Sequence, residues 1–399
     1  MHIHCTNGTP IVDTLDHVPP MPLLIDYRNF LTGQDDIGVC HALQLHDRVR
    51  HISLQLQLRP SILHKFLMLM AEHFPILEHL TLISTMDSLT PLTLPKAFLA
   101  PNLRHLTLSG IGLPKRSWLL TSTISLVTLK LWEIQTSSYF RPRLIVARLR
   151  SLLQLEELHI GFSIPIPRPS TERELLGEQG IPVTLPNLNT LEFQGVSVYL
   201  ESFITQIRAP VLKRLEITLF NQVAFTLPHL SDFINTTEGL KIPVLKVSFS
   251  YHSIYVTTSN SFGFLDGPFF IQVKCKPLDW QIDCATQICT ALAPALLVSD
   301  VEKFTLDVYS HSFQVNLVDY EIDETTWHEL LRSFFGMREL HIDARLLGEL
   351  ARALRMDELG SDPGFLPDLQ KIVAKRNPFA SFIDARQVVG RPVLFSPWY

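Results

Sequence analysis

The amino-acid sequence predicts an α/β solenoid of irregular repeats, with parallel strands on the concave side and helices on the convex side. Three observations lead to this prediction. A short apolar motif recurs along the chain, its copies are spaced like the units of αβ repeat proteins, and amphipathic helical segments lie between them. Because a solenoid grows by adding units, a chain of 399 residues needs no division into several compact cores.

The recurring motif reads P-x-L-x-x-L-x-L, in which Ile, Val or Phe can replace the last two leucines. Proline fixes its own φ and favours an extended residue before it. The alternation at the end of the motif places its apolar residues on one face of a short strand. Copies that keep the proline begin at Pro75, Pro101, Pro186, Pro210 and Pro367.

The central apolar residue of each copy marks one repeat of a leucine-rich type. The marker residues are Ile52, Leu80, Leu106, Leu129, Leu158, Leu191, Leu215, Leu245, Phe304, Leu340 and Ile372. Most intervals between markers span roughly 23 to 36 residues, which is typical of leucine-rich repeats. The interval from Leu245 to Phe304 is about twice as long and contains a strand-like run at 269–273, which indicates a degenerate repeat or an insertion around 250–300.

The predicted organisation has two parts. Residues 1–45 are rich in Pro and Asp and are predicted to be an extended N-terminal or capping segment. Residues 46–399 are predicted to form the leucine-rich-repeat solenoid, with about 11 irregular repeats. Two segments outside the motif, 161–182 and 250–268, are predicted to be loops on the rim.

Helices are predicted from apolar residues that recur with the spacing i, i+3, i+4, i+7. This spacing places them on one helix face. It occurs at Leu63, Phe66, Leu67 and Met70, at Leu200, Phe203, Ile204 and Ile207, at Trp327, Leu330, Leu331 and Phe334, and at Leu346, Leu347, Leu350 and Leu354. The alternative is a conventional α/β sheet with another strand order, but such a sheet has no need of a recurring short motif.

Composition argues against several classes of function and location. The net charge is −5, whereas a nucleic-acid surface needs a clear basic excess, so no nucleic-acid partner is expected. The longest apolar run, 291–298, is too short to span a bilayer, and the N-terminus does not read as a signal peptide. Five scattered cysteines without a C-x-x-C pair suggest reduced thiols, so a cytoplasmic or nuclear protein is expected.

Motifs of catalysis and of cofactor or metal binding are not found in the sequence. It has no G-x-G-x-x-G, P-loop, H-E-x-x-H or G-x-S-x-G. His2, His4 and Cys5 have no second cluster to complete a metal site, and Cys284 and Cys289 are interpreted as small apolar fillers. No catalytic, cofactor or metal residues are therefore predicted, and an enzyme is the least supported class.

The candidate binding surface is the ladder of side chains on the concave side. In each L-x-L the middle residue points away from the core, and aromatic Trp132 and Phe162 are expected beside this ladder. Aromatic anchors next to charges are typical of protein-binding surfaces. The predicted partner-binding residues are Lys130, Trp132, His159, Glu192, Glu216, Lys246 and His341. The alternative is that these polar residues only solvate the exposed face of a solenoid.

Histidines also recur at one place in the repeat. His51, His79 and His105 each stand immediately before a marker residue. This is a repeat-positional pattern and not a catalytic constellation.

Several segments, taken in order, resemble the leucine-rich region of F-box proteins of mushroom-forming fungi. They are His17–Pro19, Ile25–Arg28, Phe74–Leu80, Ala100–Gly110, Leu185–Leu188, Phe220–Gln222, Leu278–Gln281, Phe382–Gln387 and Gly390–Pro392. The resemblance implies an intracellular protein-binding module. In that family the F-box binds the Skp-type adaptor of a cullin-RING ubiquitin ligase, and the repeats hold the ubiquitination substrate.

The chain departs from that family where the F-box would be. Pro22-Leu-Leu-Ile25 followed by Asp36-Ile37 is only a superficial echo of an F-box, and no tryptophan precedes Trp118. Adaptor binding is therefore expected only if an F-box is supplied. A stand-alone leucine-rich-repeat scaffold with no ubiquitin link is the alternative function.

Overall fold

The computed structural model describes most of the chain. The described residues are 3–5, 21–29, 36–56, 60–84, 92–114, 119–165, 181–222, 224–240, 244–250, 252–258, 267–275, 278–293, 301–308, 324–334, 336–354 and 365–397. They form two compact units. Unit 1 comprises Met1–Gly195 with Thr205–Val211, and unit 2 comprises Val196–Ile204 with Leu212–Tyr399.

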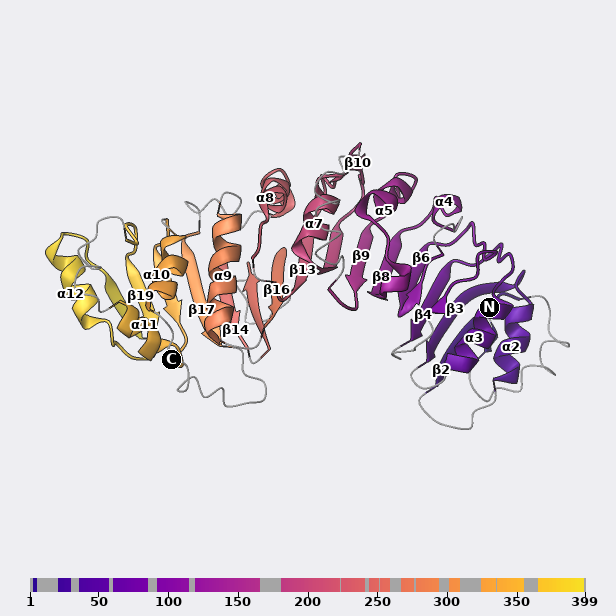
Figure 1. The fold of residues 1–399 in the computed structure, drawn as a ribbon, viewed down its shortest axis with the longest axis horizontal. Coiled ribbons are helices and arrows are strands. Elements are labelled where there is room, and N and C mark those ends of the chain that lie inside the picture. The colour runs from indigo at the N-terminus through magenta and orange to yellow at the C-terminus, as the bar shows by residue number, and fades with distance from the viewer. Residues whose placement is uncertain are drawn as a thin grey trace. The chain divides into compact units, whose positions relative to one another are not determined.

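Unit 1 is built on a parallel sheet whose strands follow chain order (Figure 1). Its strands are β1 (Ile3–Cys5), β2 (Leu23–Asn29), β3 (Val49–Leu56), β4 (His79–Ser84), β6 (His105–Ser109), β8 (Thr128–Ile134), β9 (Glu157–Phe162) and β11 (Thr190–Gly195). Two short parallel pairs accompany the sheet, namely β5 (Leu92–Thr93) with β7 (Ile111–Gly112), and β10 (Val183–Thr184) with β12 (Ile207–Arg208).

The markers of unit 1 lie in one row across the sheet. Ile52 pairs with Leu80, Leu80 with Leu106, and the row continues through Leu129 and Leu158 to Leu191. All six side chains are fully buried. The burial of alternate residues along β4, β6 and β11 confirms that one face of each strand forms the core.

The motif also contributes polar contacts where the strands begin. In two P-N-L copies the asparagine reaches back to the preceding repeat. Asn102 Nδ2 donates to the carbonyl of Pro75 at 2.6 Å, and Asn187 Nδ2 donates to the carbonyl of Leu153 at 2.9 Å. These bonds satisfy turn carbonyls that the strand ladder leaves open, so they help to fix the spacing of successive repeats.

Segment 1–45 contributes two strands to the same sheet as the first repeats and then forms helix α2 (Ile37–Gln44). Strand β1 pairs with β2, and β2 pairs with β3, all in parallel. Leu23, Ile25 and Tyr27 alternate into the core. The predicted rim loop 161–182 begins inside β9, and its residues 166–180 lie outside the described residues.

The helices of unit 1 lie between its strands in the chain. They are α2 (Ile37–Gln44), α3 (Pro60–Leu69), α4 (Leu119–Ser122), the 3-10 turn η1 (Thr136–Ser138) and α5 (Pro142–Leu149). Leu63, Phe66 and Leu67 of α3 are buried, as their spacing predicts. Pro142 occupies the first turn of α5, where its missing N–H costs no hydrogen bond.

The strands of unit 2 lie in the order β13-β16-β15-β14-β17-β18-β19-β20. The strands are β13 (Arg214–Phe220), β14 (Val244–Phe249), β15 (Ser253–Thr257), β16 (Phe269–Lys274), β17 (Lys303–Val308), β18 (Glu339–Ile342), β19 (Lys371–Ala374) and β20 (Leu394–Pro397). Leu245, Phe304, Leu340 and Ile372 form one buried row across β14, β17, β18 and β19.

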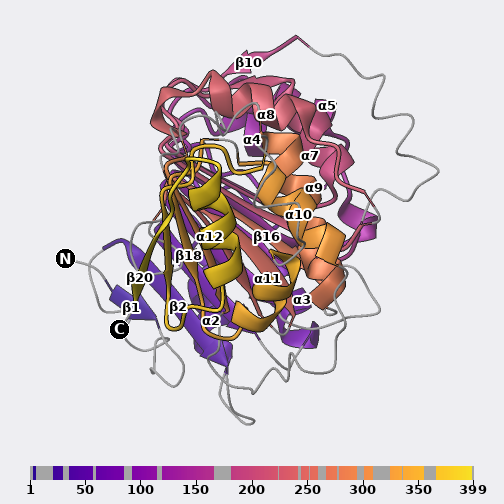
Figure 2. The ribbon, with the colours of Figure 1, turned by 90° about the vertical axis from the view of Figure 1, so that its left-hand side faces the viewer.

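The helices of unit 2 are α7 (Ser197–Ile204), α8 (Pro228–Asn235), the turn η2 (Glu238–Leu240), α9 (Leu278–Leu292), α10 (Glu324–Arg332), α11 (Leu347–Ala353) and α12 (Ala380–Val388). Figure 2 shows α11 and α12 on one side of β18 and β20. Helix α10 packs against both α9 and α11. None of the helices in the described ranges is both long enough and apolar enough to cross a membrane.

The predicted rim loop 250–268 is wrong for residues 253–257, which form a central strand. Strand β15 runs antiparallel to β14 on one side and to β16 on the other. A tight connection makes this possible, because Ser250 N donates to the carbonyl of Ser253 at 2.9 Å. The long interval between Leu245 and Phe304 therefore holds a meander, β14-β15-β16, and helix α9, and β16 takes the place beside β13.

A buried arginine organises the last repeat of unit 2. Arg386 of α12 is almost fully buried. Its guanidinium donates to the carbonyls of Phe365, Leu366 and Pro367 at 3.1 to 3.3 Å. These contacts tie the entry into β19 to α12, and they give a structural reason for an arginine in the segment Phe382–Gln387.

Candidate partner-binding face

The candidate site of unit 1 is its open face. We use this name for the side chains of β3, β4, β6, β8, β9 and β11 that alternate with the buried core residues. The middle residues of the L-x-L motifs form one row on this face, because the strands are in register. The row reads Ser53, Thr81, Thr107, Lys130, His159 and Glu192.

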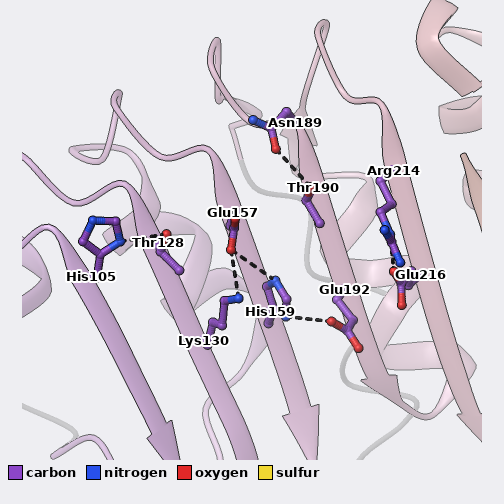
Figure 3. A network of polar contacts seen from close by, with 10 residues as sticks. All are labelled: His105, Thr128, Lys130, Glu157, His159, Asn189, Thr190, Glu192, Arg214 and Glu216. Carbon is purple, nitrogen blue, oxygen red and sulfur yellow. Dashed lines mark hydrogen bonds and ion pairs between the residues drawn. The ribbon is translucent and has the colours of Figure 1, made fainter. Parts of the chain in front are cut away.

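Three predicted site residues meet in a charge cluster on this face (Figure 3). The cluster consists of Lys130, Glu157, His159 and Glu192. Lys130 Nζ lies 2.9 Å from Glu157 Oε2, His159 Nδ1 lies 2.7 Å from Glu192 Oε2, and His159 Nε2 lies 3.9 Å from Glu157 Oε2. The hydrogen bond from Lys130 lowers the pKa of the Glu157 carboxyl below its ordinary value.

Two features of the cluster were not predicted. Glu157 stands one residue before the marker of its strand, a position that the L-x-L pattern does not include. Charged residues also stand directly before other markers, and this recurrence is the sequence signal that could have identified Glu157. The second feature is the burial of the His159 side chain, whose ring nitrogens have no aligned hydrogen-bond partner among the described residues. Its ring nitrogens lie close to two carboxylates, those of Glu157 and Glu192.

Trp132 is held in place by its neighbours on β9. A Cβ atom at Gly161 would overlap the indole ring, so glycine is what lets the ring lie against the backbone there. The indole also meets the His159 ring edge-on, with centroids 5.6 Å apart. Just beyond Trp132, β8 changes register, and Glu133 takes a left-handed conformation with φ of 51°. The partly exposed indole is therefore a fixed aromatic surface beside the charge cluster.

Phe162 does not belong to this face, so the sequence-based placement of this residue beside the ladder is wrong. Its side chain is fully buried and contacts the Phe193 ring at a centroid distance of 6.3 Å. The reason is the two-residue period of a strand, because Leu158, Ile160 and Phe162 all point to the same side.

The open face also carries a histidine strip, formed by His51, His79 and His105. The rings of His79 and His105 are stacked, with centroids 4.3 Å apart and planes 9° apart, and the His51 ring is 5.4 Å from that of His79. His105 Nδ1 lies 3.1 Å from Thr128 Oγ1. Burial lowers the pKa of His79 and of His105. Neighbouring histidines lower the pKa of His79 further, and the charge of Arg104 lowers that of His105. The sequence shows the three positions, but only the strand register stacks them.

The remaining predicted site residues lie in unit 2 and are also paired. Glu216 contacts Arg214 on the same strand, and Lys246 Nζ lies 2.7 Å from Asp307 Oδ2. Strand register puts Lys246 and His341 in one row with a threonine between them. Strands β16 and β15 separate Glu216 from that row. The structure therefore divides the predicted set into a group of four residues in unit 1 and three in unit 2.

His341 and Glu339 form a pair at the start of β18. His341 Nε2 lies 3.1 Å from Glu339 Oε2. Burial lowers the pKa of His341, although the neighbouring carboxylate opposes this shift. The hydrogen bond with His341 lowers the pKa of Glu339.

Other surfaces offer hollows but no cluster suited to metal chemistry. Within the described residues, no group of three or more His, Cys, Asp or Glu side chains could hold a metal ion. A hollow of unit 1, about 860 Å³, lies where the strands begin and is lined by residues such as Ile76, Arg104 and Leu153. Cys284 and Cys289 are both buried in α9, as fillers of the core would be.

Comparisons with known proteins give structural neighbours only. No protein-family model matches the chain, and no curated protein matches it. Solved structures that are similar to it include the following three. The TLR13–ssRNA13 complex matches at 11% identity with a TM-score of 0.36 and covers 96% of this chain, which spans 48% of the TLR13 chain.

The two other neighbours are bacterial proteins. The leucine-rich repeat-containing protein LegL7 of Legionella pneumophila is 14% identical, with 99% of each chain covered and a TM-score of 0.29. The protein LIC12759 of Leptospira interrogans, also a leucine-rich-repeat protein, is 10% identical, with 94% and 89% of the chains covered and a TM-score of 0.30. The fold class of this protein therefore rests on its own repeat geometry, which defines an α/β leucine-rich-repeat solenoid.

Proposed function

We propose that this chain is a protein-binding leucine-rich-repeat module and that it serves as the substrate-recognition part of an F-box-type ubiquitin-ligase receptor. The observation that carries the binding role is the open face of unit 1, where Trp132 lies beside the charge cluster. The ligase role has different support. It rests on the ordered sequence segments that resemble the fungal F-box proteins.

The physical case for binding at this face is preorganisation. Lys130, His159 and Glu192 are already held by their neighbours, and the indole of Trp132 lies on the backbone at Gly161. A partner that docks here need not order these side chains, so less conformational entropy is lost on association. Large aromatic groups next to charged groups are also the residues that dominate binding energy in protein interfaces.

The binding role can be tested by affinity purification from cells of the source organism, read by mass spectrometry. The bait is the tagged full chain, in the wild type and in the double variant Lys130→Ala/Trp132→Ala. Lys65→Ala is the matched control, because Lys65 lies on helix α3 and also pairs with one carboxylate, that of Asp36. We expect specific partners to be lost with the double variant and kept with Lys65→Ala. Equal recovery with all three baits would contradict the use of this face.

The ligase role needs a second experiment with the purified Skp-type adaptor. We expect the chain alone to leave the adaptor unbound and a fusion with an upstream F-box to bind it. We also expect the fusion to promote ubiquitination of the partners captured through Trp132. If those partners remain unmodified with a fully assembled ligase, the stand-alone scaffold becomes the better description. An in-frame F-box exon upstream of Met1 would argue against that scaffold.

A further inference from the structure

Two cysteine side chains of unit 2 lie in contact at the edge of a hollow. Cys275 directly follows β16, and Cys284 lies in the second turn of α9. The Cys284 thiol donates a hydrogen bond to the sulfur of Cys275, and both side chains are buried. The indole of Trp280, one helical turn before Cys284, donates to the Cys284 sulfur. The two sulfurs are therefore neighbours, although they belong to different elements.

The amide of Gln281 holds the two elements together at this point. Its Nε2 atom donates to the carbonyl of Cys275 at 2.9 Å and to the carbonyl of Ser250 at 2.8 Å. Gln281 and Cys284 are three residues apart on α9, so they lie on the same face of the helix. This amide therefore ties the helix face that carries Cys284 to the backbone of Cys275. A disulfide requires its two Cβ atoms at a short and specific separation, so an arrangement that is fixed before the reaction favours its formation.

The hollow gives a small oxidant a route to one of the two sulfurs. Its volume is about 520 Å³, and Cys275 lines it together with residues such as Asn221, Gln272 and Trp280. The side chain of Cys284 is fully buried. An oxidant of the size of hydrogen peroxide therefore meets Cys275 first.

The hydrogen bonds of the pair also assign a role to each cysteine. The bonds from the Cys284 thiol and from the backbone N–H of Ile254 lower the pKa of Cys275, although burial opposes this shift. They stabilise the thiolate, which is the nucleophilic form of cysteine. The hydrogen bond to Cys275, together with burial, raises the pKa of Cys284, so this thiol keeps its proton.

We propose that Cys275 and Cys284 are a site of reversible oxidation, at which a hydroperoxide converts the two thiols into a disulfide. The Cys275 thiolate attacks one oxygen of the peroxide and the O–O bond breaks, which leaves Cys275 as a sulfenic acid. The departing hydroxide takes up the proton that Cys275 released and becomes water. The Cys284 sulfur then attacks the sulfur of Cys275, the S–O bond breaks, and the hydroxyl leaves with the thiol proton as a second water. The two thiols lose two electrons to the peroxide, and a dithiol reverses the link by thiol–disulfide exchange.

The test exposes the reduced full chain to hydrogen peroxide and then blocks the remaining thiols with N-ethylmaleimide. The protease Asp-N, which cuts before Asp279 and Asp283, places the two cysteines on separate peptides. We expect mass spectrometry to find these peptides joined, with a mass two hydrogen atoms below their sum, and to find them separated after treatment with dithiothreitol. The peroxide is increased until the partly exposed Cys40 is also oxidised, which establishes that the oxidant has acted.

Two variants separate the roles of the cysteines. Cys284→Ser should leave Cys275 as a sulfenic acid that dimedone traps, because the second sulfur is missing. Cys289→Ser is the matched control and should form the link as the wild type does. Cys289 lies in the same helix, and burial raises its pKa to about 12.

Two outcomes would overturn the inference. One is oxidation of Cys40 without a link between Cys275 and Cys284, and the other is a link that forms only after the chain is unfolded in urea. Circular dichroism establishes that the variants are folded, and the wild-type measurement decides the matter if one of them is not. The pair lies in unit 2, away from the open face of unit 1, so the proposed function does not depend on the result.

Discussion

At the scale of single residues, the face of the strand on which a side chain lies decides whether it is buried in the core or lies on the open face. Leu106 and Thr107 are neighbours in the chain, but Leu106 is fully buried and Thr107 is on the open face. Gly161 and Trp132 show the same rule across two strands, because the glycine makes room for the ring that its neighbour projects. Each of these two pairs can be tested by substitution.

The first prediction concerns the strand register of β6. Leu106→Asp should destabilise the protein by more than about 3 kcal/mol, because it buries a carboxylate and removes core volume. Thr107→Asp should change the free energy of unfolding by no more than about 0.5 kcal/mol, because its side chain meets solvent. Thermal unfolding followed by circular dichroism measures both. Equal melting of the two variants would show that the register is wrong.

The second prediction concerns Gly161. Gly161→Val should push the Trp132 indole off the backbone, shift its fluorescence, and cost roughly 1 to 3 kcal/mol in stability, as overpacking does. In the background of Trp132→Ala the same valine should cost much less, because no ring is there to be displaced. A double-mutant cycle by urea unfolding measures the coupling. Additive effects of the two changes would rule out the contact.

At the scale of elements, α8 depends on a side chain from another helix. Pro228 begins α8, and the residue before it, Leu227, offers no capping side chain. Glu201 of α7 supplies the cap instead, because its carboxylate accepts from the backbone N–H groups of His229 and Leu230 at 2.8 and 2.9 Å. Burial raises the pKa of Glu201, although these two hydrogen bonds oppose the shift.

The third prediction follows from this cap. Glu201→Leu should cost roughly 1 to 3 kcal/mol, because it leaves two backbone donors of the helix start without an acceptor. Glu201→Gln should cost less, since one amide oxygen remains. Glu238→Gln, at an exposed glutamate of η2, is the control and should be neutral. Urea unfolding measures all three, and a Glu201→Leu variant as stable as the control would contradict the capping role.

At the scale of the whole molecule, acidity should act first through histidines. The pKa values of His79, His105 and His341 lie below the ordinary 6.5 in the folded protein. The unfolded chain therefore binds more protons as pH falls below 6.5, and the free energy of unfolding decreases with acidification. Glu157 and Glu339, whose pKa values are also lowered, add to this loss below their ordinary value of 4.5.

The fourth prediction is a stability profile between about pH 8 and 5, a range that covers the histidine transition. Urea unfolding of the wild type should give a plateau above the imidazole range and a decline below it. The variant His79→Gln/His105→Gln should decline less steeply, whereas His64→Gln/His73→Gln should follow the wild type. A strip variant with the same slope as the wild type would mean that these rings do not control the acid response.

Much of the fold could be predicted from the sequence, because its signals are local and repeated. Each marker residue is recognised from a few neighbouring residues of its own strand. All of the markers lie in strands and are buried. The helical spacings were equally local, but the prediction was wrong for Ile207, which lies in β12 beyond the end of α7. Segment 253–257 was missed because it lacks the motif, and its place in the sheet depends on β14 and β16 rather than on its own residues.

The candidate site was predictable only in part. Alternation places Lys130 and His159 in the row of the open face, as the strand register has them, but it says nothing of which charges meet. Glu157 enters the charge cluster, and the rings of the three histidines meet, only because neighbouring repeats align residue by residue. The placement of Phe162 was wrong because the two-residue period of the strand was not followed to its end, where it puts Phe162 on the core side.

The sequence by itself determined the repeat, the identity of the core residues and the class of the fold, because strand period and apolar spacing act over a few residues. Tertiary structure alone decided the antiparallel strand β15, the pairing of charges around His159 and the stacked histidine strip. These features arise from contacts between neighbouring strands, so they depend on how the strands come into register.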